Sequence, residues 1–311
     1  MTKPDEVALL LIVWRRPACV ELVIDAIRNI RPKRIYVASD GPREGNAEEA
    51  ANVMLTRKIV AQGIDWPCVV HRRYSDVNQG CRLGVSRAID WFFECESEGI
   101  ILEDDIVPDP TFFSFCAELL VRYRDDEQIG SISAVTFRPE SNKLSSNYYF
   151  SRYTHVWGWA TWRRAWHCYE SDMSSWEQLR RAGWLNGLGG RLFEMYWRVV
   201  FDSVYSRKVD TWDYTLVYSF WRKGLLTCIP DRVLVQNIGF GSLATHTTGG
   251  GSPLRRVIPM QEPLDHPQRA ERDVAADAIF QKKLHLEWLR SATLGRIKRN
   301  FGRFIKIYKT P

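Results

Sequence analysis

Short apolar runs alternate with segments of helical spacing through the first half of the chain, and this alternation constrains the fold more than any other feature. The apolar runs have the length and branched residues of strands and occupy Val7–Trp14, Arg34–Ser39, Cys68–His71, Gly99–Leu102 and Ile129–Val135. Helical patterns lie between them at Pro17–Ile30, Asn46–Ala61, Gly84–Glu94 and Pro110–Tyr123. Strands that alternate with helices form parallel βαβ units. We therefore predict an α/β, Rossmann-like fold with a mostly parallel sheet, helices on both faces, and a ligand site at the carboxyl ends of the strands.

The charge is concentrated at one end of the chain. Residues 281–311 contain nine Lys or Arg and one acid, which leaves 34 basic and 36 acidic residues in the remainder of the 311-residue chain. A nearly neutral body argues against a nucleic-acid partner, because domains that bind nucleic acid carry a basic stripe across the fold. We predict a catalytic domain over residues 1–250, followed over 251–311 by a Gly/Pro-rich linker and a basic amphipathic helical tail.

The tail favours peripheral contact with an anionic membrane. Its apolar residues recur at steps of three and four, as on one face of a helix: Leu294, Ile297, Phe301, Phe304, Ile305 and Tyr308. The alternative is that this face docks on the catalytic domain. The seven cysteines form no Cys-X-X-Cys pair, as expected in a reducing compartment, and the Val7–Trp14 run is too short to span a membrane. We therefore expect a cytoplasmic protein, with the tail at the inner face of the membrane.

Three acids, Glu103, Asp104 and Asp105, end the fourth predicted strand. Adjacent carboxylates repel one another unless a cation neutralises them, and carboxylate oxygens suit Mn²⁺ or Mg²⁺, which also bind phosphate oxygens. Side chains alternate along a strand, so Glu103 and Asp105 are expected to share a face. Asp105 is then the candidate metal ligand, with Asp104 left to contact a ribose or sugar hydroxyl. The alternative is that the acids cap the next helix.

Polar residues also follow the other predicted strands. Arg16 comes after the first strand and Asp40 after the second, where each could face a nucleotide, although a surface arginine and a plain Asp-Gly-Pro turn are the alternatives. Asn78, Gly80 and Arg82 precede the third helix, whose first amides could meet a diphosphate; a helix cap is the alternative.

An aromatic stretch from His155 to Trp166 contains Gly158 and Trp159, which could lie against the apolar face of a sugar. Tight core packing is the alternative, and Trp162 and Trp166 fit that alternative better. Asp213, beside Trp212, is the candidate general base, unless it caps a helix. His246, near a glycine-rich loop, could touch metal or phosphate, but a lone histidine is more often structural.

In this order, these motifs resemble those of the inverting GT-A glycosyltransferases related to N-acetylglucosaminyltransferase I, over roughly Val7 to Thr248. The resemblance implies a UDP-sugar donor whose uridine is held by Arg16 and Asp40. It further implies Mn²⁺ on Asp105, the donor sugar near Gly158 and Trp159, and Asp213 as the base. The absence of an N-terminal anchor suggests a bacterial relative that acts on a glycan or lipid-linked acceptor.

Two other functions remain open at this point. A sugar-1-phosphate nucleotidyltransferase would share the nucleotide, the metal and the sheet, but it normally carries a glycine-rich loop after the first strand, and Trp14-Arg15-Arg16-Pro17 contains no glycine. A non-catalytic carbohydrate-binding protein would explain the aromatic residues but not the acidic strand end.

Overall fold

The computed structural model describes residues 2–138, 146–239 and 256–293, and within its last helix the side chains up to residue 289. Eight strands form one sheet in the order β3-β2-β1-β4-β8-β6-β9-β7, and β5 pairs with β10 in a small second sheet. The strands are β1 (Leu9–Val13), β2 (Arg34–Ser39), β3 (Val69–Tyr74), β4 (Glu98–Glu103), β5 (Ile106–Pro108), β6 (Ile129–Ser133), β7 (Tyr148–Ser151), β8 (Trp159–Trp162), β9 (Leu226–Pro230) and β10 (Val235–Asn237). In the large sheet only β7 and β8 run against the other strands.

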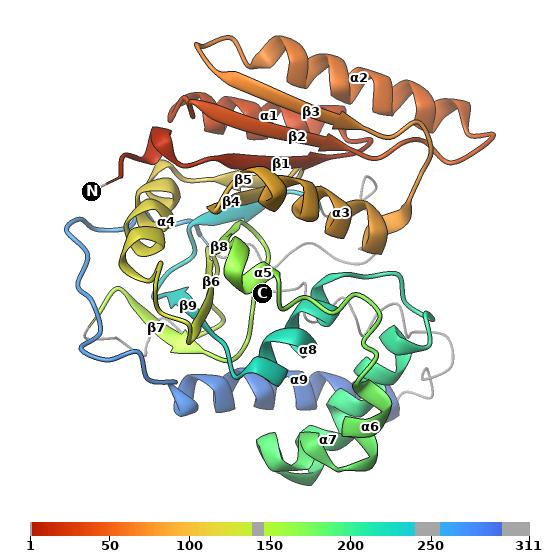
Figure 1. Cartoon of the computed structure of the whole chain (residues 1–311), viewed down its shortest axis with the longest axis vertical. Helices are drawn as coiled ribbons and strands as arrows, with labels where there is room; N and C mark the ends of the chain where they lie inside the picture. Colours follow the sequence, from red (N-terminus) through yellow and green to blue (C-terminus); the bar gives the residue numbers. More distant parts are fainter. Residues whose placement is uncertain (1, 139–145, 240–255, 294–311) are drawn as a thin grey trace.

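Helices cover both faces of the sheet (Figure 1). They are η1 (Pro4–Glu6), α1 (Pro17–Arg28), α2 (Ala47–Gly63), α3 (Gly80–Cys95), α4 (Pro110–Arg122), α5 (Arg163–Trp166), α6 (Trp176–Arg181), α7 (Trp184–Tyr205), α8 (Asp213–Lys223) and α9 (Val274–Thr293). The alternation of β1 shows why two layers form: Leu9 and Leu11 pack into the core under α1 and α4, whereas Leu10 packs into the core under α3. The predicted α/β class, with a mostly parallel sheet covered on both faces, is confirmed.

The strand order places a reversal beside β1. The chain moves from β1 outward through β2 to β3, and then returns to add β4 on the other side of β1. Such a reversal opens a crevice at the carboxyl ends of the two central strands, because the connections that follow them leave in opposite directions. The fold therefore provides a ligand site at the ends of β1 and β4.

The last described helix packs against the rest of the molecule. Phe280 and Leu284 of α9 lie in the same core as the sheet, and the indole of Trp197 on α7 donates a hydrogen bond to Gln281 at 3.0 Å. The predicted boundary at residue 250 lies outside the described residues and stays a prediction. In the part of the chain that the structure describes, no helix has both the length and the apolar character needed to cross a bilayer.

Candidate active site

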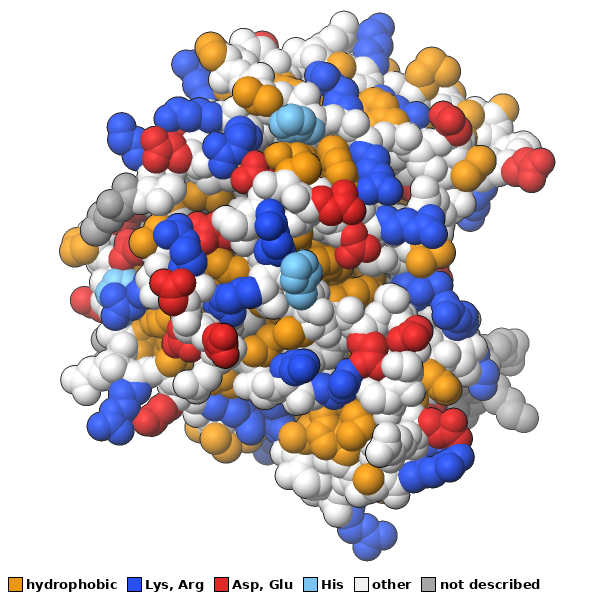
Figure 2. Space-filling view, viewed as in Figure 1, with side chains coloured by type: hydrophobic (Ala, Val, Ile, Leu, Met, Phe, Trp, Pro, Cys, Tyr) orange, Lys and Arg blue, Asp and Glu red, His pale blue; other side chains and the backbone are white. Residues whose placement is uncertain are grey.

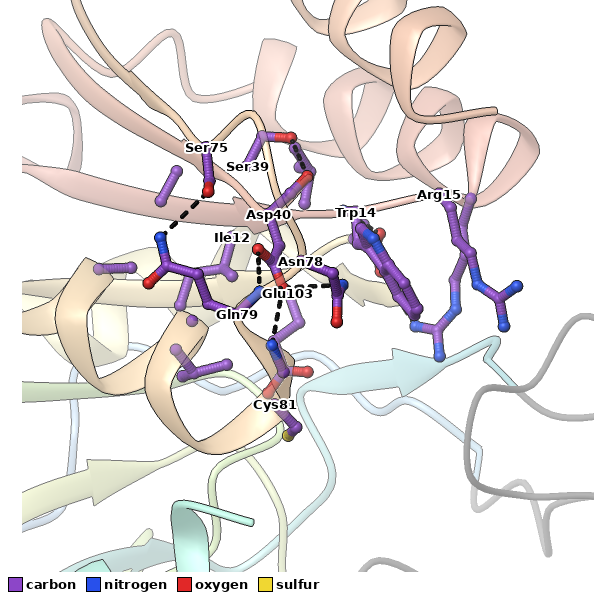
Figure 3. Close-up of a pocket in the computed structure, with 18 of the residues that line it drawn as sticks. Ile12, Trp14, Arg15, Ser39, Asp40, Ser75, Asn78, Gln79, Cys81 and Glu103 are labelled. Atoms are coloured by element: carbon purple, nitrogen blue, oxygen red, sulfur yellow. Dashed lines mark hydrogen bonds and ion pairs between the residues drawn. The ribbon is translucent and has the colours of Figure 1, made fainter. Parts of the chain in front are cut away.

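A cavity of about 410 Å³ opens at the carboxyl ends of β1 to β4. The predicted site residues that line it are Arg16, Asp40, Asn78, Gly80, Glu103, Asp104 and Asp105. Figure 3 shows Asp40, Asn78 and Glu103 converging from the end of β2, the start of α3 and the end of β4. The volume is within the usual range for small-molecule sites. The parallel strand ends thus bring together residues that are up to about 90 positions apart in the sequence, as their shared edge predicts.

Arg16 forms a buried ion-pair cluster with the acids at the end of β4. Its Nη1 donates to Asp104 Oδ1 at 3.0 Å and to Asp105 Oδ2 at 2.5 Å, and Asp104 also accepts the backbone N–H of Trp14 at 2.9 Å. Strand alternation predicts that Asp104 points away from Glu103 and Asp105, but β4 ends at Glu103 and the alternation does not continue into the turn, so all three acids line the cavity. Both aspartates instead face the same guanidinium.

The electrostatics of this cluster follow from burial. Burial raises the pKa of Asp104 above its ordinary value, and repulsion from Asp105 adds to this effect, while Arg16 opposes it. Burial alone would lower the pKa of Arg16. Attraction to Asp105, Asp104 and Glu103 outweighs this effect, so the pKa of Arg16 lies above its ordinary value. The guanidinium therefore stays charged and provides the cation that lets two carboxylates lie together in a nearly dry site.

The fit of a divalent metal at Asp105 is partial. Carboxylate oxygens suit Mg²⁺ and Mn²⁺, and such ions often use only one or two protein carboxylates together with substrate phosphates. Among the described residues, however, no group of three or more His, Cys, Asp or Glu side chains is arranged to hold a metal. Asp105 is also close to Gly239, where a Cβ atom would meet Asp105 Oδ2, so only glycine fits there without a shift. The described part of the site offers suitable oxygens but fewer than three protein ligands.

Asp40 caps the N-terminus of α3. Its carboxylate accepts hydrogen bonds from the side-chain amide of Asn78 at 3.0 Å, from the backbone N–H of Gln79 at 2.9 Å and from that of Gly80 at 3.2 Å (Figure 3). Burial raises the pKa of Asp40, and the backbone hydrogen bonds from Gln79, Gly41 and Gly80 oppose this shift. The helix cap that was the alternative for Asn78, Gly80 and Arg82 is therefore present in this conformation, and Asp40 is the capping residue at the wall of the cavity.

Asp210 is a cavity residue for which sequence reasoning assigned no role. It precedes α8, and its carboxylate accepts the backbone N–H of Cys81 at 2.8 Å and of Arg82 at 3.2 Å. Asp40 and Asp210 together therefore occupy the amides that were predicted to meet a diphosphate. The Arg82 side chain does not line the cavity. The only sequence signal for Asp210 was an acid three residues before the aromatic-flanked Asp213.

The aromatic motif lies mainly in the core. Trp159 is 1% exposed and stacks on Trp212, with ring centroids 5.7 Å apart, and neither it nor Gly158 lines the cavity. Gly158 has a φ of +63°, and a Cβ there would lie 2.9 Å from Val235 Cγ1, so close packing explains this glycine. Trp157, its neighbour, is the tryptophan of this stretch that lines the cavity. Trp162 and Trp166 are also buried, as their spacing favoured, although a strand end and α5 hold them rather than one helix.

Asp213 begins α8 and is 2% exposed. Its Oδ1 accepts hydrogen bonds from the Thr211 hydroxyl and from the backbone N–H of Tyr214 at 3.0 Å. It does not line the cavity in this conformation, whereas Asp210 does. Asp213 as the base therefore stays a prediction. His246 and the predicted amphipathic tail lie outside the described residues.

A cation–aromatic cluster forms another wall that the sequence did not indicate. The guanidinium groups of Arg15 and Arg43 lie over the Trp14 ring, at 4.5 and 5.5 Å from the ring centroid. Both arginines pair with Glu49 of α2, which is buried, at 3.1 and 2.7 Å. Because Glu49 is more than 30 residues from Arg15 along the chain, only the packing of α2 against α1 makes this wall.

Comparisons with known proteins give weak likenesses. No protein-family model matches the sequence, and no curated protein matches it significantly. Similar solved structures include a mannosyltransferase from Pyrobaculum calidifontis in complex with GDP-Man and Mn²⁺, with a TM-score of 0.40 and 14% identity. That likeness covers 74% of this chain but only 56% of the mannosyltransferase, so this chain spans little more than half of its length.

A second similar structure is a 4-diphosphocytidyl-2C-methyl-D-erythritol synthase from Anaerococcus prevotii, with a TM-score of 0.35 and 7% identity over 72% of this chain and 87% of that one. Likenesses this weak establish neither a family nor an activity, so the function has to be inferred from the site. The resemblance to the N-acetylglucosaminyltransferase I-related enzymes stays a prediction.

Proposed function

We propose that this chain is a GT-A-type glycosyltransferase that moves a sugar, with inversion, from a UDP-sugar to a glycan or lipid-linked acceptor. The single observation that carries the proposal is the cavity at the ends of β1 and β4, lined by Arg16, Asp104 and Asp105. A nucleotide-sugar needs such a combination: a strand-end crevice for the nucleoside and charged groups for the diphosphate. Acceptance of a lipid-linked substrate would place the enzyme at the inner face of a membrane.

The cations and acids of the cavity have separable roles in this proposal. Arg15, Arg16 and Arg43 bring positive charge to the wall where the diphosphate would lie, and a rigid, paired guanidinium binds phosphate oxygens well. Asp105 is the residue that would hold Mn²⁺ or Mg²⁺ between itself and the phosphates. Bound there, the ion would stabilise negative charge on the departing nucleoside diphosphate. Asp105 would have to share its oxygens with Arg16, which pairs with them.

Transfer to an acceptor hydroxyl requires a base that removes its proton. Asp213 holds this role on the sequence resemblance, while Asp210 is the carboxylate of the same loop that lines the cavity. A base has to come within hydrogen-bond reach of the acceptor oxygen. Whichever aspartate is the base, its replacement by Asn should lower kcat far more than replacement of the other. Inversion follows from a single displacement in which the acceptor oxygen attacks opposite the departing diphosphate.

A sugar-1-phosphate nucleotidyltransferase is the alternative, because it would use the same crevice for its nucleotide. The residues after β1 count against it: the bulky Trp14 ring, contacted by two arginines, stands where such enzymes need a flexible glycine-rich loop. A carbohydrate-binding protein without activity would not need the ion-pair cluster of Arg16.

One experiment separates these functions. The full chain is incubated with Mn²⁺ and a panel of nucleotide-sugars, and the released products are identified. Slow release of nucleoside diphosphate supports a glycosyltransferase. Formation of nucleoside triphosphate and sugar-1-phosphate from the donor and added pyrophosphate identifies a nucleotidyltransferase. Binding without turnover identifies a binding protein. Asp105→Asn should abolish turnover and weaken donor binding while the protein stays folded. Full activity in excess EDTA would contradict the metal role of Asp105.

A further inference from the structure

The outward side of α9 is apolar for a helix at the surface. Its buried side, with Phe280 and Leu284, enters the core, as expected for a helix that docks on a sheet. Its exposed residues, among those whose side chains are described, are Val274, Ala275, Ala278, Lys282, Leu286 and Leu289. A helix that faces water carries polar residues on that side. With a single charge among the six, this side has the composition of a contact surface.

Exposed apolar side chains also lie on α7, which packs beside α9 (Figure 1). The Tyr196 ring of α7 contacts His285 and Trp288 of α9, with centroids 5.8 and 5.9 Å apart. Leu192 and Met195 lie on the same helix within one turn of Tyr196, and Leu286 and Leu289 directly follow the two residues it contacts. These four side chains, which we call the α7–α9 patch, are between 44% and 49% exposed.

Basic residues accompany the patch. Arg191 and Arg198 of α7 and Lys282 of α9 are exposed close to its members along their helices. The acids between those members, Glu194 and Glu287, are only partly exposed. Figure 2 shows hydrophobic side chains gathered over the lower part of the molecule, where Figure 1 places α7 and α9, with Lys and Arg side chains next to them. The chain also leaves α9 into its most basic segment, since residues 294–311 hold six Lys or Arg and no acid.

We propose that the α7–α9 patch is a docking surface for a bilayer that contains anionic phospholipid. The apolar side chains of the patch can enter the acyl-chain region of such a bilayer, while the basic side chains beside them contact its anionic headgroups. A second copy of this chain fits less well, because pairing through α9 would bring two strongly basic segments together, and like charges repel. The docking surface is independent of the chemistry in the cavity and does not rest on the proposed function.

The test is co-sedimentation of the full chain with vesicles. Vesicles of phosphatidylcholine alone are compared with vesicles of phosphatidylcholine and phosphatidylglycerol in equal parts. The variant Leu192→Gln/Met195→Gln/Leu286→Gln removes apolar surface without changing charge. We expect the wild type to bind the anionic vesicles in preference, less strongly as salt rises, and the variant to bind them at least about tenfold more weakly.

The matched control is Leu22→Gln/Met54→Gln/Leu55→Gln on α1 and α2, at the opposite end of the molecule (Figure 1). Those residues are between 46% and 69% exposed, so at least as much apolar surface is removed elsewhere. The control should bind vesicles like the wild type, and the melting temperature of each variant shows that it is folded. Absence of wild-type binding, equal binding by the patch variant, or equal loss in the control would overturn the proposal. So would a wild-type dimer, seen by light scattering, that the patch variant dissociates without losing vesicle binding.

Discussion

The charged motif residues at the ends of β1, β2 and β4 lie together at the cavity. The motif residues around β8 and α8 are instead packed in the interior. Arg16, Asp40, Asp104 and Asp105 belong to the first region, and Trp159 to the second. Both regions are motif-rich in sequence. The difference is that the residues just after the parallel strand ends reach the cavity, whereas β8 runs antiparallel between two strands and buries its side chains on both faces.

The comparison also separates two acids of one loop. Asp210 reaches across to the first region and holds the amides at the start of α3, while Asp213, three residues later, belongs to the buried second region. An acid can thus resemble a catalytic residue in sequence and still be placed by packing. Substitutions in each region, taken in order of decreasing expected effect, test whether the division between them holds.

The largest effect is expected from the two aspartates of the loop. If Asp213 is the base, Asp213→Asn lowers kcat by about 10²–10⁴-fold with donor affinity nearly unchanged, and Asp210→Asn has a much smaller effect. The reverse outcome would make Asp210 the base and confirm that the cavity, rather than the motif, identifies it. Steady-state kinetics with donor and acceptor varied separately, beside thermal melting of both variants, distinguish the two results.

Arg16→Met should be strongly destabilising, because it leaves Asp104 and Asp105 buried without their shared cation. We expect a loss of about 3–5 kcal/mol in the free energy of unfolding, measured by urea titration at neutral pH. Arg124→Met removes an exposed arginine that pairs with Glu98 and should change stability by less than about 1 kcal/mol. Similar values for the two variants would mean that the strand-end cluster is not a buried charge site.

Trp159→Phe tests the second region. A buried indole that stacks on Trp212 contributes to packing, so its replacement should lower the free energy of unfolding by about 1–2 kcal/mol and leave the KM for the donor unchanged. Trp157→Phe, in the cavity wall, should instead raise that KM. A rise in KM for the Trp159 variant at unchanged stability would indicate that Trp159 contacts the donor sugar, as the resemblance implies.

The smallest effect concerns pH. Burial raises the pKa of Asp40 in the folded state above its pKa in the unfolded chain. The contribution of Asp40 to stability is therefore greatest at low pH, where the carboxyl is protonated in both states. That contribution declines as the pH rises from the unfolded-state pKa through the folded-state pKa. Asp40→Asn lacks this decline. Urea midpoints between about pH 3 and pH 6 should therefore fall more steeply, or rise less, in the wild type than in the variant. Parallel curves would contradict a raised pKa.

Through the first half of the chain, the alternation of strands and helices, the mostly parallel class of the sheet and the acids at its edge were determined by the sequence. Local periodicity sets each element, and the connection between parallel strands always returns the chain to the same edge. This is why Arg16, Asp40, Glu103 and Asp105 could be expected at one cavity although they are far apart along the chain.

Only the tertiary structure decided what each polar group faces. The pairing of Arg16 with both aspartates, the capping of α3 by Asp40 and Asp210, and the Glu49 cluster around Trp14 depend on contacts between distant elements. The burial of Trp159 likewise depends on β8 lying between β4 and β6. Residue type and spacing indicate what a side chain can bind. The burial of that side chain and the groups it contacts depend on tertiary packing, which a local sequence pattern does not specify.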